Sequence, residues 1–156
     1  MAILKSIPVT QEFPLETDPE GKARVTFRQA SWGEQAERET IFAKQSIEYD
    51  DDARGTVRQT FNWTQSQLIQ KELFLTLSGA VDLMYQEYNK DGEPKGDPKE
   101  LFTFLTSSSG RSRLNISESE FLKRLSDYVP PEMVKEMHKL CREVNIQWKS
   151  SEGNAE

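Results

Sequence analysis

The stretch PPEMVKEMHKLCREVNIQW, residues 130–148, predicts the helix around which the core of this chain forms. Its proline pair stops a preceding helix and suits the first turn of a new one. Plotted at 100° per residue, Met137, Leu140, Val144 and Trp148 lie within about 60° of Met133, and with Cys141 and Val134 they form one apolar face. Packing in the core is the default expectation for such a face, although a terminal amphipathic helix can also offer one edge to a partner helix.

The same stretch contains the only histidine and the only cysteine of the chain, His138 and Cys141, about one helical turn apart. A catalytic pair and half of a metal site are both possible. Cys141 nevertheless lies within the apolar face, where a thiol usually acts as a small buried hydrophobe, and His138 lies on its flank. Zinc would need further ligands from a chain without another His or Cys. We therefore predict a core cysteine, and keep a small enzyme or metalloprotein using this pair as an alternative.

Capping signals predict two more helices. Ser31 and Glu34 have capping-box spacing, which predicts a helix over residues 31–44. Ser117 and Glu120 repeat this spacing at the start of a helix that ends at the proline pair.

The most apolar part of the chain predicts a central helix over residues 67–88, with Leu73 and Leu77 on its buried side. A polar turn follows, and Asp97-Pro98 predicts the start of a short helix over residues 99–106. The serine-rich residues 107–113 are typical of a flexible linker.

Alternating apolar residues predict strands near the N-terminus. Residues 23–30 place Val25 and Phe27 on one side, which indicates a half-buried strand. Residues 46–50 and 56–63 also alternate and predict an antiparallel pair around the loop DDARG.

These patterns together predict an α+β fold that is mostly helical, with a small N-terminal strand or hairpin element packed on a bundle of four to five helices. The proline-rich residues 1–22 are expected to form an arm or an edge segment. Residues 23–148 would form a single domain, and residues 149–156 a disordered tail.

Composition restricts the classes of function. The chain has 26 acidic and 20 basic residues and a formal net charge of −6, so we expect no binding to nucleic acid. The apolar run at the start is too short to span a bilayer, and the single cysteine suits a reducing cytosol, so we expect a soluble cytosolic protein. The acidic loops DDDARG and NKDGEP lack a complete calcium ligand pattern, and no motif indicates a cofactor.

Two stretches carry a resemblance to a known family. The helix KELFLTLSGAVDL runs into the acidic turn NKDGEPKGDP, and VPPEMVKEMHKLCREVNIQW ends with Val144, Asn145 and Trp148. This layout, over about residues 24–148, resembles the tail assembly chaperones of long-tailed bacteriophages. The chain departs from their pattern at Ile146, where proline is common, and in its long serine-rich insert at residues 107–113.

The resemblance implies a non-catalytic protein that keeps the helical tape measure protein soluble while tail tube subunits assemble, in the cytoplasm of an infected or lysogenic bacterial host. Its partners would be the tape measure protein and possibly the tail tube protein, and a homo-oligomer is possible. We predict that the partner surface consists of Met133, Met137, Leu140, Val144 and Trp148, supported by Leu73 and Leu77. A structural virion subunit, such as a tail or head-tail component, is the alternative.

Overall fold

The computed structural model describes residues 2, 9–51 and 54–153, and the side chains of residues 2, 9–41 and 65–149. The strands in this part of the chain are β1 (Thr10–Pro14), β2 (Arg24–Arg28), β3 (Leu77–Val81), β4 (Met84–Tyr85), β5 (Lys99–Glu100), β6 (Phe104–Thr106) and β7 (Ser112–Leu114). The helices are α1 (Trp32–Asp51), α2 (Arg54–Thr76), α3 (Glu118–Tyr128), α4 (Pro131–Val144) and α5 (Ile146–Gly153).

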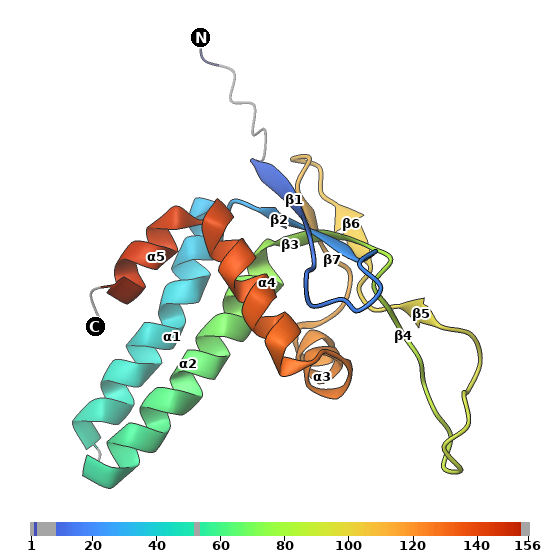
Figure 1. Cartoon of the computed structure of the whole chain (residues 1–156). Coiled ribbons are helices and arrows are strands. Elements are labelled where there is room, and N and C mark those ends of the chain that lie inside the picture. Colours follow the sequence, from blue (N-terminus) through green and yellow to red (C-terminus); the bar gives the residue numbers. More distant parts are fainter. Residues whose placement is uncertain (1, 3–8, 52–53, 154–156) are drawn as a thin grey trace.

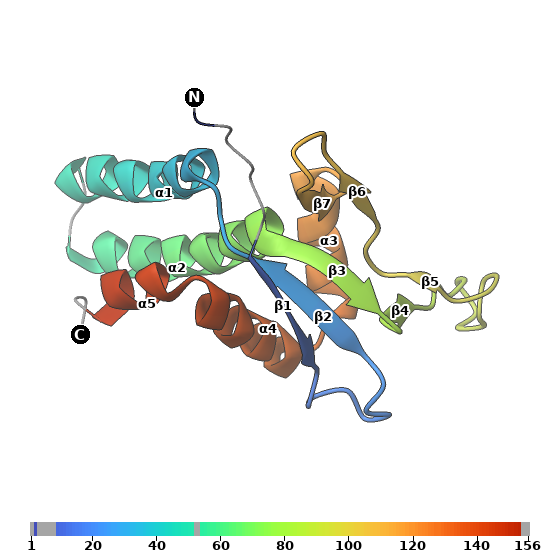
Figure 2. The same cartoon turned by 90° about the horizontal axis from the view of Figure 1, so that it is seen from above.

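The body of the fold is an antiparallel sheet of three strands in the order β1-β2-β3. The predicted alternation in β2 is confirmed, because Val25 and Phe27 are both fully buried. Helix α4 packs against β1, β2 and α2, so the core lies between the sheet and the helices. Figures 1 and 2 show that the hairpin of α1 and α2 extends to one side of this body. Strands β4 and β5 and the loop between them, residues 84–100, extend to the other side and are called the β4–β5 arm.

Much of the predicted N-terminal arm belongs to the body. Strand β1 pairs with β2 along its whole length, and Leu15 is buried in the core. The carboxylate of Asp18 accepts hydrogen bonds from the backbone N–H groups of Lys22 and Ala23, both at 2.8 Å, and so fixes the turn between the strands. The edge-segment alternative is therefore correct for β1, while residues 1 and 3–8 lie outside the described residues.

The capping box at the start of α1 is confirmed. The Ser31 hydroxyl accepts a hydrogen bond from the Glu34 backbone N–H at 3.2 Å, and the Glu34 carboxylate accepts one from the Ser31 N–H at 2.9 Å. The antiparallel strand pair predicted over residues 46–63 is wrong, because both segments continue the helices α1 and α2. A short alternation of apolar and polar residues favours a strand only slightly, and packing of a capped helix against a neighbouring helix outweighs it. Residues 52–53 of the predicted DDARG loop lie outside the described residues.

The predicted central helix is only partly correct, since α2 begins earlier, at Arg54, and ends at Thr76. The residues that follow form β3, which pairs with β2. A Cβ atom at Gly79 would lie 3.3 Å from the Thr26 side chain, so a glycine suits this close contact between strands. Residues 77–81 therefore form a strand rather than a continuation of the helix, because β2 pairs with them and Gly79 allows close contact between the strands.

The predicted short helix over residues 99–106 and the predicted linker over residues 107–113 are both wrong. Strand β5 pairs with β4, and β6 pairs with β7 in a hairpin. The hairpin turn is closed by hydrogen bonds from the Gly110 N–H to the Ser107 carbonyl at 2.9 Å and from the Ser107 N–H to the Arg111 carbonyl at 2.8 Å. Gly110 has a φ of 82°, a conformation that favours glycine. Serine-rich composition alone did not reveal this turn.

The last helices follow the prediction at their starts and depart from it at their ends. The Ser117 hydroxyl caps α3 by accepting from the Glu120 N–H at 3.1 Å, and α4 begins at Pro131. Helix α4 ends at Val144, so Trp148 lies on α5 rather than on the same helix. The tail predicted to be disordered is helical up to Gly153, and residues 154–156 lie outside the described residues.

The fold is α+β, as predicted, with five helices among the described residues. Seven strands accompany them, so the prediction of a mostly helical chain built on a bundle is not confirmed. No described helix is both long enough and apolar enough to cross a membrane.

Asn145, which follows α4, connects the end of that helix to the segment between β2 and α1, and it provides a test of this packing. This fully buried side chain accepts a hydrogen bond from the Ala30 N–H at 2.8 Å and donates to the carbonyls of Arg28 and Cys141. We expect Asn145→Ala to lower the free energy of unfolding by about 3 kcal/mol, because it leaves buried backbone groups unpaired. Urea denaturation measures this change. The exposed Asn115→Ala is the control, and equal stabilities of the two variants would contradict the expected role.

Candidate functional site

The apolar face predicted as a partner-binding surface lies inside the molecule. Leu140 is partly buried, and the other residues of the predicted set are buried, namely Met133, Met137, Val144, Trp148, Leu73 and Leu77. The sheet and α2 pack against this side of α4 and leave no room for a partner. The default expectation of core packing therefore holds for these residues, and the hypothesis of a partner surface on them is corrected, because their side chains are not accessible to a partner.

Cys141 is a structural residue in this fold. Its side chain is fully buried, with Sγ 3.1 Å from the Thr76 Oγ1. Burial raises the pKa of the thiol to about 12, so almost none of it is thiolate near neutral pH. The Thr76 hydroxyl donates to the Glu72 carbonyl at 2.7 Å, which completes a small buried hydrogen-bond network.

The sequence did not reveal the most highly charged part of the interior, which is the carboxylate of Glu72 on α2. Its Oε1 lies 2.9 Å from His138 Nε2 and 2.9 Å from Arg142 Nε. Its Oε2 lies 3.0 Å from Arg142 Nη2 and 2.9 Å from Arg38 Nε. We call Glu72, Arg38, His138 and Arg142 the Glu72 cluster. It joins α1, α2 and α4 through one acidic group.

The electrostatics of the Glu72 cluster favour the ionised carboxylate. Burial raises the pKa of Glu72, but the hydrogen bonds from His138 and Arg142, with the charges of Arg142 and Arg38, outweigh it and lower the pKa to about 2. The Glu72 side chain has no exposed surface, so no substrate reaches it in this conformation. The Arg38 guanidinium also lies 4.9 Å from the centre of the Trp148 ring, which brings α5 into the same assembly. These contacts make the cluster a structural centre.

A second buried pair fixes the start of α1 against the sheet. Arg28 and Glu34 form two parallel hydrogen bonds, one of them 2.8 Å between Nη2 and Oε2. The same Nη2 donates to the Leu75 carbonyl at 2.7 Å. The pKa of Glu34 is lowered, because bonds from Arg28 and Ser31 outweigh the effect of burial. This geometry orients α1 relative to α2 and so shapes the surface between them.

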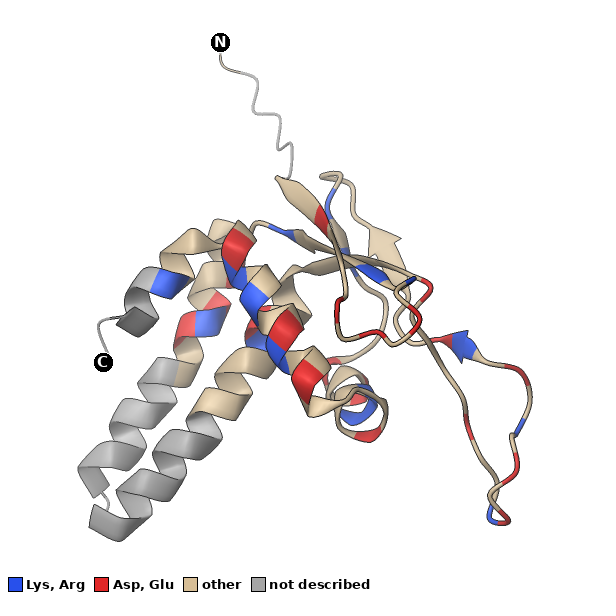
Figure 3. Cartoon of the chain, viewed as in Figure 1, with Lys and Arg blue, Asp and Glu red and all other residues tan. Residues whose placement is uncertain are grey.

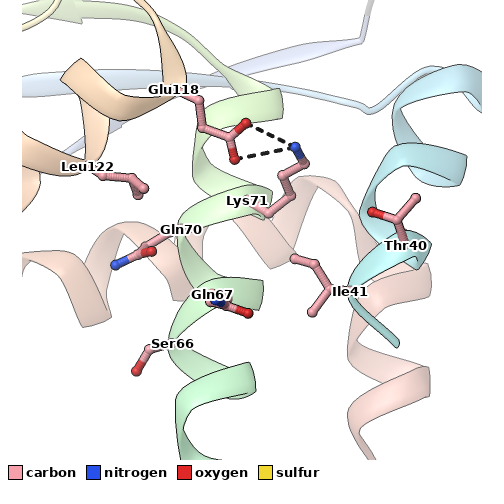
Figure 4. Close-up of a pocket in the computed structure, with 8 residues that line it drawn as sticks. All are labelled: Thr40, Ile41, Ser66, Gln67, Gln70, Lys71, Glu118 and Leu122. Atoms are coloured by element: carbon pink, nitrogen blue, oxygen red, sulfur yellow. Dashed lines mark hydrogen bonds and ion pairs between the residues drawn. The ribbon is translucent and has the colours of Figure 1, made fainter. Parts of the chain in front are cut away.

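An open groove between α1, α2 and α3 is the candidate functional site. It has a volume of about 500 Å³. Its lining combines polar side chains, Thr40, Ser66, Gln67, Gln70, Lys71 and Glu118, with the apolar Ile41 and Leu122. Figure 4 shows the α2 side chains along its length, with Lys71 reaching Glu118 at one end. We call this feature the helix groove.

Lys71 organises one end of the helix groove. Its Nζ lies 3.0 Å from Glu37 Oε1 and 3.0 Å from Glu118 Oε2, so it joins α1 to α3 across α2. Burial lowers the pKa of Lys71, but the hydrogen bonds that it donates to the two carboxylates outweigh this effect and raise the pKa. The carboxylates are about half exposed and outnumber the ammonium group, so this end of the groove is slightly acidic. It favours a partner with a basic or hydrogen-bond-donating side chain.

Comparisons with known proteins do not identify the chain: no protein-family model, curated protein or solved structure matches it. Within the described residues, no group of three or more His, Cys, Asp or Glu side chains is placed to hold a metal ion. The rejected calcium loop DDDARG includes residue 52, which lies outside that range.

The pKa of Glu72 predicts how stability changes with pH. A carboxylate with a lowered pKa in the folded state stabilises the fold above its unfolded value of 4.5, and this contribution is lost as the pH falls towards 2. We expect Glu72→Gln to be less stable than the parent by on the order of 3 kcal/mol at about pH 7, with a difference that shrinks at acidic pH. Urea denaturation across this range measures the difference. The exposed Glu39→Gln should match the parent throughout, and a constant difference for Glu72→Gln would contradict the linkage.

The burial of Cys141 predicts low reactivity. In the native protein at about pH 8, we expect iodoacetamide to leave the thiol unmodified for hours, because the thiolate is scarce and inaccessible. In urea, the same reagent should add one label per chain, which intact mass spectrometry detects. Rapid labelling of the native protein would instead support the alternative of a small enzyme or metalloprotein that uses His138 and Cys141.

Proposed function

We propose that this chain is a non-catalytic chaperone for phage tail assembly that holds helical segments of the tape measure protein while tail tube subunits assemble. The helix groove carries this proposal, because three helices line one open surface with both apolar and hydrogen-bonding side chains. Such a surface suits an amphipathic helix, whose apolar residues recur every three or four positions. The groove replaces the α4 face as the proposed contact surface.

The charges at the groove support a helical partner with basic residues beside its apolar stripe. Glu37 and Glu118 keep exposed carboxylate surface although both contact Lys71. A lysine or arginine of the partner would therefore meet a carboxylate at the end of the groove, while Ile41 and Leu122 contact its apolar side chains. In this role α1, α2 and α3 would form the partner-binding part of the predicted helical bundle, and the sheet would hold these helices in place.

The surface charge supports a protein that stays soluble while it holds an apolar partner. The chain has a net charge of −6, and Figure 3 shows acidic and basic residues interspersed along the described part of the chain. Repulsion between like-charged complexes keeps them dispersed. We place this activity in the cytoplasm of an infected or lysogenic bacterial host, with the tail tube protein as a possible second partner and a homo-oligomer as a possible form.

The two residues that suggested an enzyme have structural contacts. His138 contacts the buried Glu72, and Cys141 is enclosed with a raised pKa. These contacts favour a binding function over nucleophilic or metal chemistry at this pair.

A structural virion subunit is the second candidate function. The observation that favours it is the β4–β5 arm, which extends from the body of the fold in Figures 1 and 2. Extended arms can interlock neighbouring subunits in an assembly. Mass spectrometry of purified particles separates the two functions, because a subunit occurs at a fixed ratio to the tube protein and a chaperone is absent.

The helix groove predicts the effect of a single substitution on partner binding. We expect Gln67→Arg to weaken binding of a helical tape measure fragment at least about tenfold, because the longer charged side chain fills the groove. Isothermal titration calorimetry with the purified fragment measures the affinity.

Gln65→Arg is the matched control, since it makes the same change at an exposed position of α2 that does not line the groove. Equal binding by both folded variants would exclude the groove as the contact surface. No binding of the parent chain to any tape measure segment would reject the chaperone function itself.

A further inference from the structure

A second pocket lies where the β4–β5 arm meets α3. It has a volume of about 270 Å³ and is lined from the arm by Tyr85, Tyr88 and Lys95 and from α3 by Lys123 and Tyr128, among others. We call it the arm pocket. It is separate from the helix groove, because Glu118 and Leu122 line the groove whereas other positions of α3 line the arm pocket.

The wall of the arm pocket is held in place by several contacts. The rings of Tyr85 and Tyr128 lie 4.6 Å apart between centroids, and the Arg124 guanidinium lies 5.4 Å from the centre of the Tyr85 ring. Arg124 is fixed in turn, because it donates to the Leu101 carbonyl at 2.8 Å and contacts the Glu120 carboxylate at 3.0 Å. The aromatic wall is therefore preorganised, which lowers the entropic cost of binding a ligand.

The arm side of the pocket is also anchored by backbone contacts. The Lys95 N–H donates to the Glu87 carbonyl at 2.8 Å, and Tyr88 forms a bridge with Pro94. The Gln86 side chain donates to the Gly96 carbonyl at 3.1 Å. These bonds hold the two sides of the arm together at Lys95, which lies between the tip of the arm and the strands β4 and β5.

The charges that line the arm pocket do not balance. Arg124 is paired with Glu120, and Glu87 lies 3.4 Å from Lys99. Lys95 and Lys123 form no ion pair within the described residues, although they line the same pocket in a chain with a net charge of −6. Two cations beside exposed tyrosine rings form a local site for a negatively charged group.

We propose that the arm pocket binds an acidic segment of a partner polypeptide. A carboxylate of the segment would interact with Lys95 and Lys123, and its backbone and side chains would pack against Tyr88 and Tyr128, which are 62% and 40% exposed. A polypeptide is favoured over a nucleic acid because it can present a single carboxylate to the two lysines, whereas every nucleotide carries a phosphate that Asp91, Glu93 and other carboxylates of the arm repel. The proposal does not rest on the chaperone function.

Chemical shift mapping by NMR tests the arm pocket with defined probes. The probes are a hexaglutamate peptide, the matched hexaglutamine peptide and a short oligothymidine. We expect hexaglutamate alone to shift the amide signals of Lys95, Lys123 and their neighbours. Its binding should weaken at least about fivefold in Lys95→Gln/Lys123→Gln, and also on addition of salt.

The control variant Lys135→Gln/Lys139→Gln removes the same charge from exposed positions of α4 and should bind hexaglutamate as the parent does. A thermal melt checks that both double variants fold. Equal weakening by both would overturn the proposal, because binding would then follow overall charge. Stronger binding of oligothymidine would also overturn it, as would the absence of any shift with hexaglutamate.

Discussion

The buried carboxylate of Glu72 is the constraint on which the arrangement of the helices depends. Taking an isolated carboxylate out of water costs several kcal/mol, so the fold is stable only where cations and hydrogen bonds surround it. Arg38 contacts Glu72 from α1 and Arg142 contacts it from α4, while His138 adds a hydrogen bond from α4. The position of α1 against α2 follows from this requirement, and with it two of the three walls of the helix groove. The shape of the helix groove at the surface therefore depends on the buried charge of Glu72.

The elements that the sequence predicted correctly are those with a local physical cause. Ser31 and Ser117 cap helices through their own side chains, Pro131 suits a first turn, and alternation in β2 reflects burial of one side of the strand. The elements that were missed depend on a partner elsewhere in the chain. Leu77–Val81 is apolar enough for a helix and becomes β3 because β2 pairs with it. Residues 46–63 alternate briefly, yet they continue helices that pair with each other.

The candidate site was less predictable than the fold, for a related reason. Helical periodicity identified the apolar face of α4 correctly, but periodicity does not indicate whether such a face meets the same chain or another one. The signal for the Glu72 cluster was present, since Glu72 lies within the most apolar stretch and Arg142 directly follows the buried Cys141. A charged residue in such a position needs a partner, but one sequence does not say which. The helix groove and the arm pocket combine residues from separate elements and have no motif.

The spacing of the Glu72 cluster along the chain has a consequence for biosynthesis. Glu72 precedes His138 by 66 residues and Arg142 by 70, so the ribosome completes α1 and α2 well before these two contacts of Glu72 on α4 exist. The β1–β2 hairpin can form early from local contacts, but closing the core before α4 is made would bury Glu72 with Arg38 as its only counter-charge and without the helix that packs on α2. Folding of the body therefore waits until α4 leaves the exit tunnel. Until then the buried side of α2, with Leu73 and Leu75, lacks the helix that covers it, and a product truncated before Arg142 would be open to proteolysis.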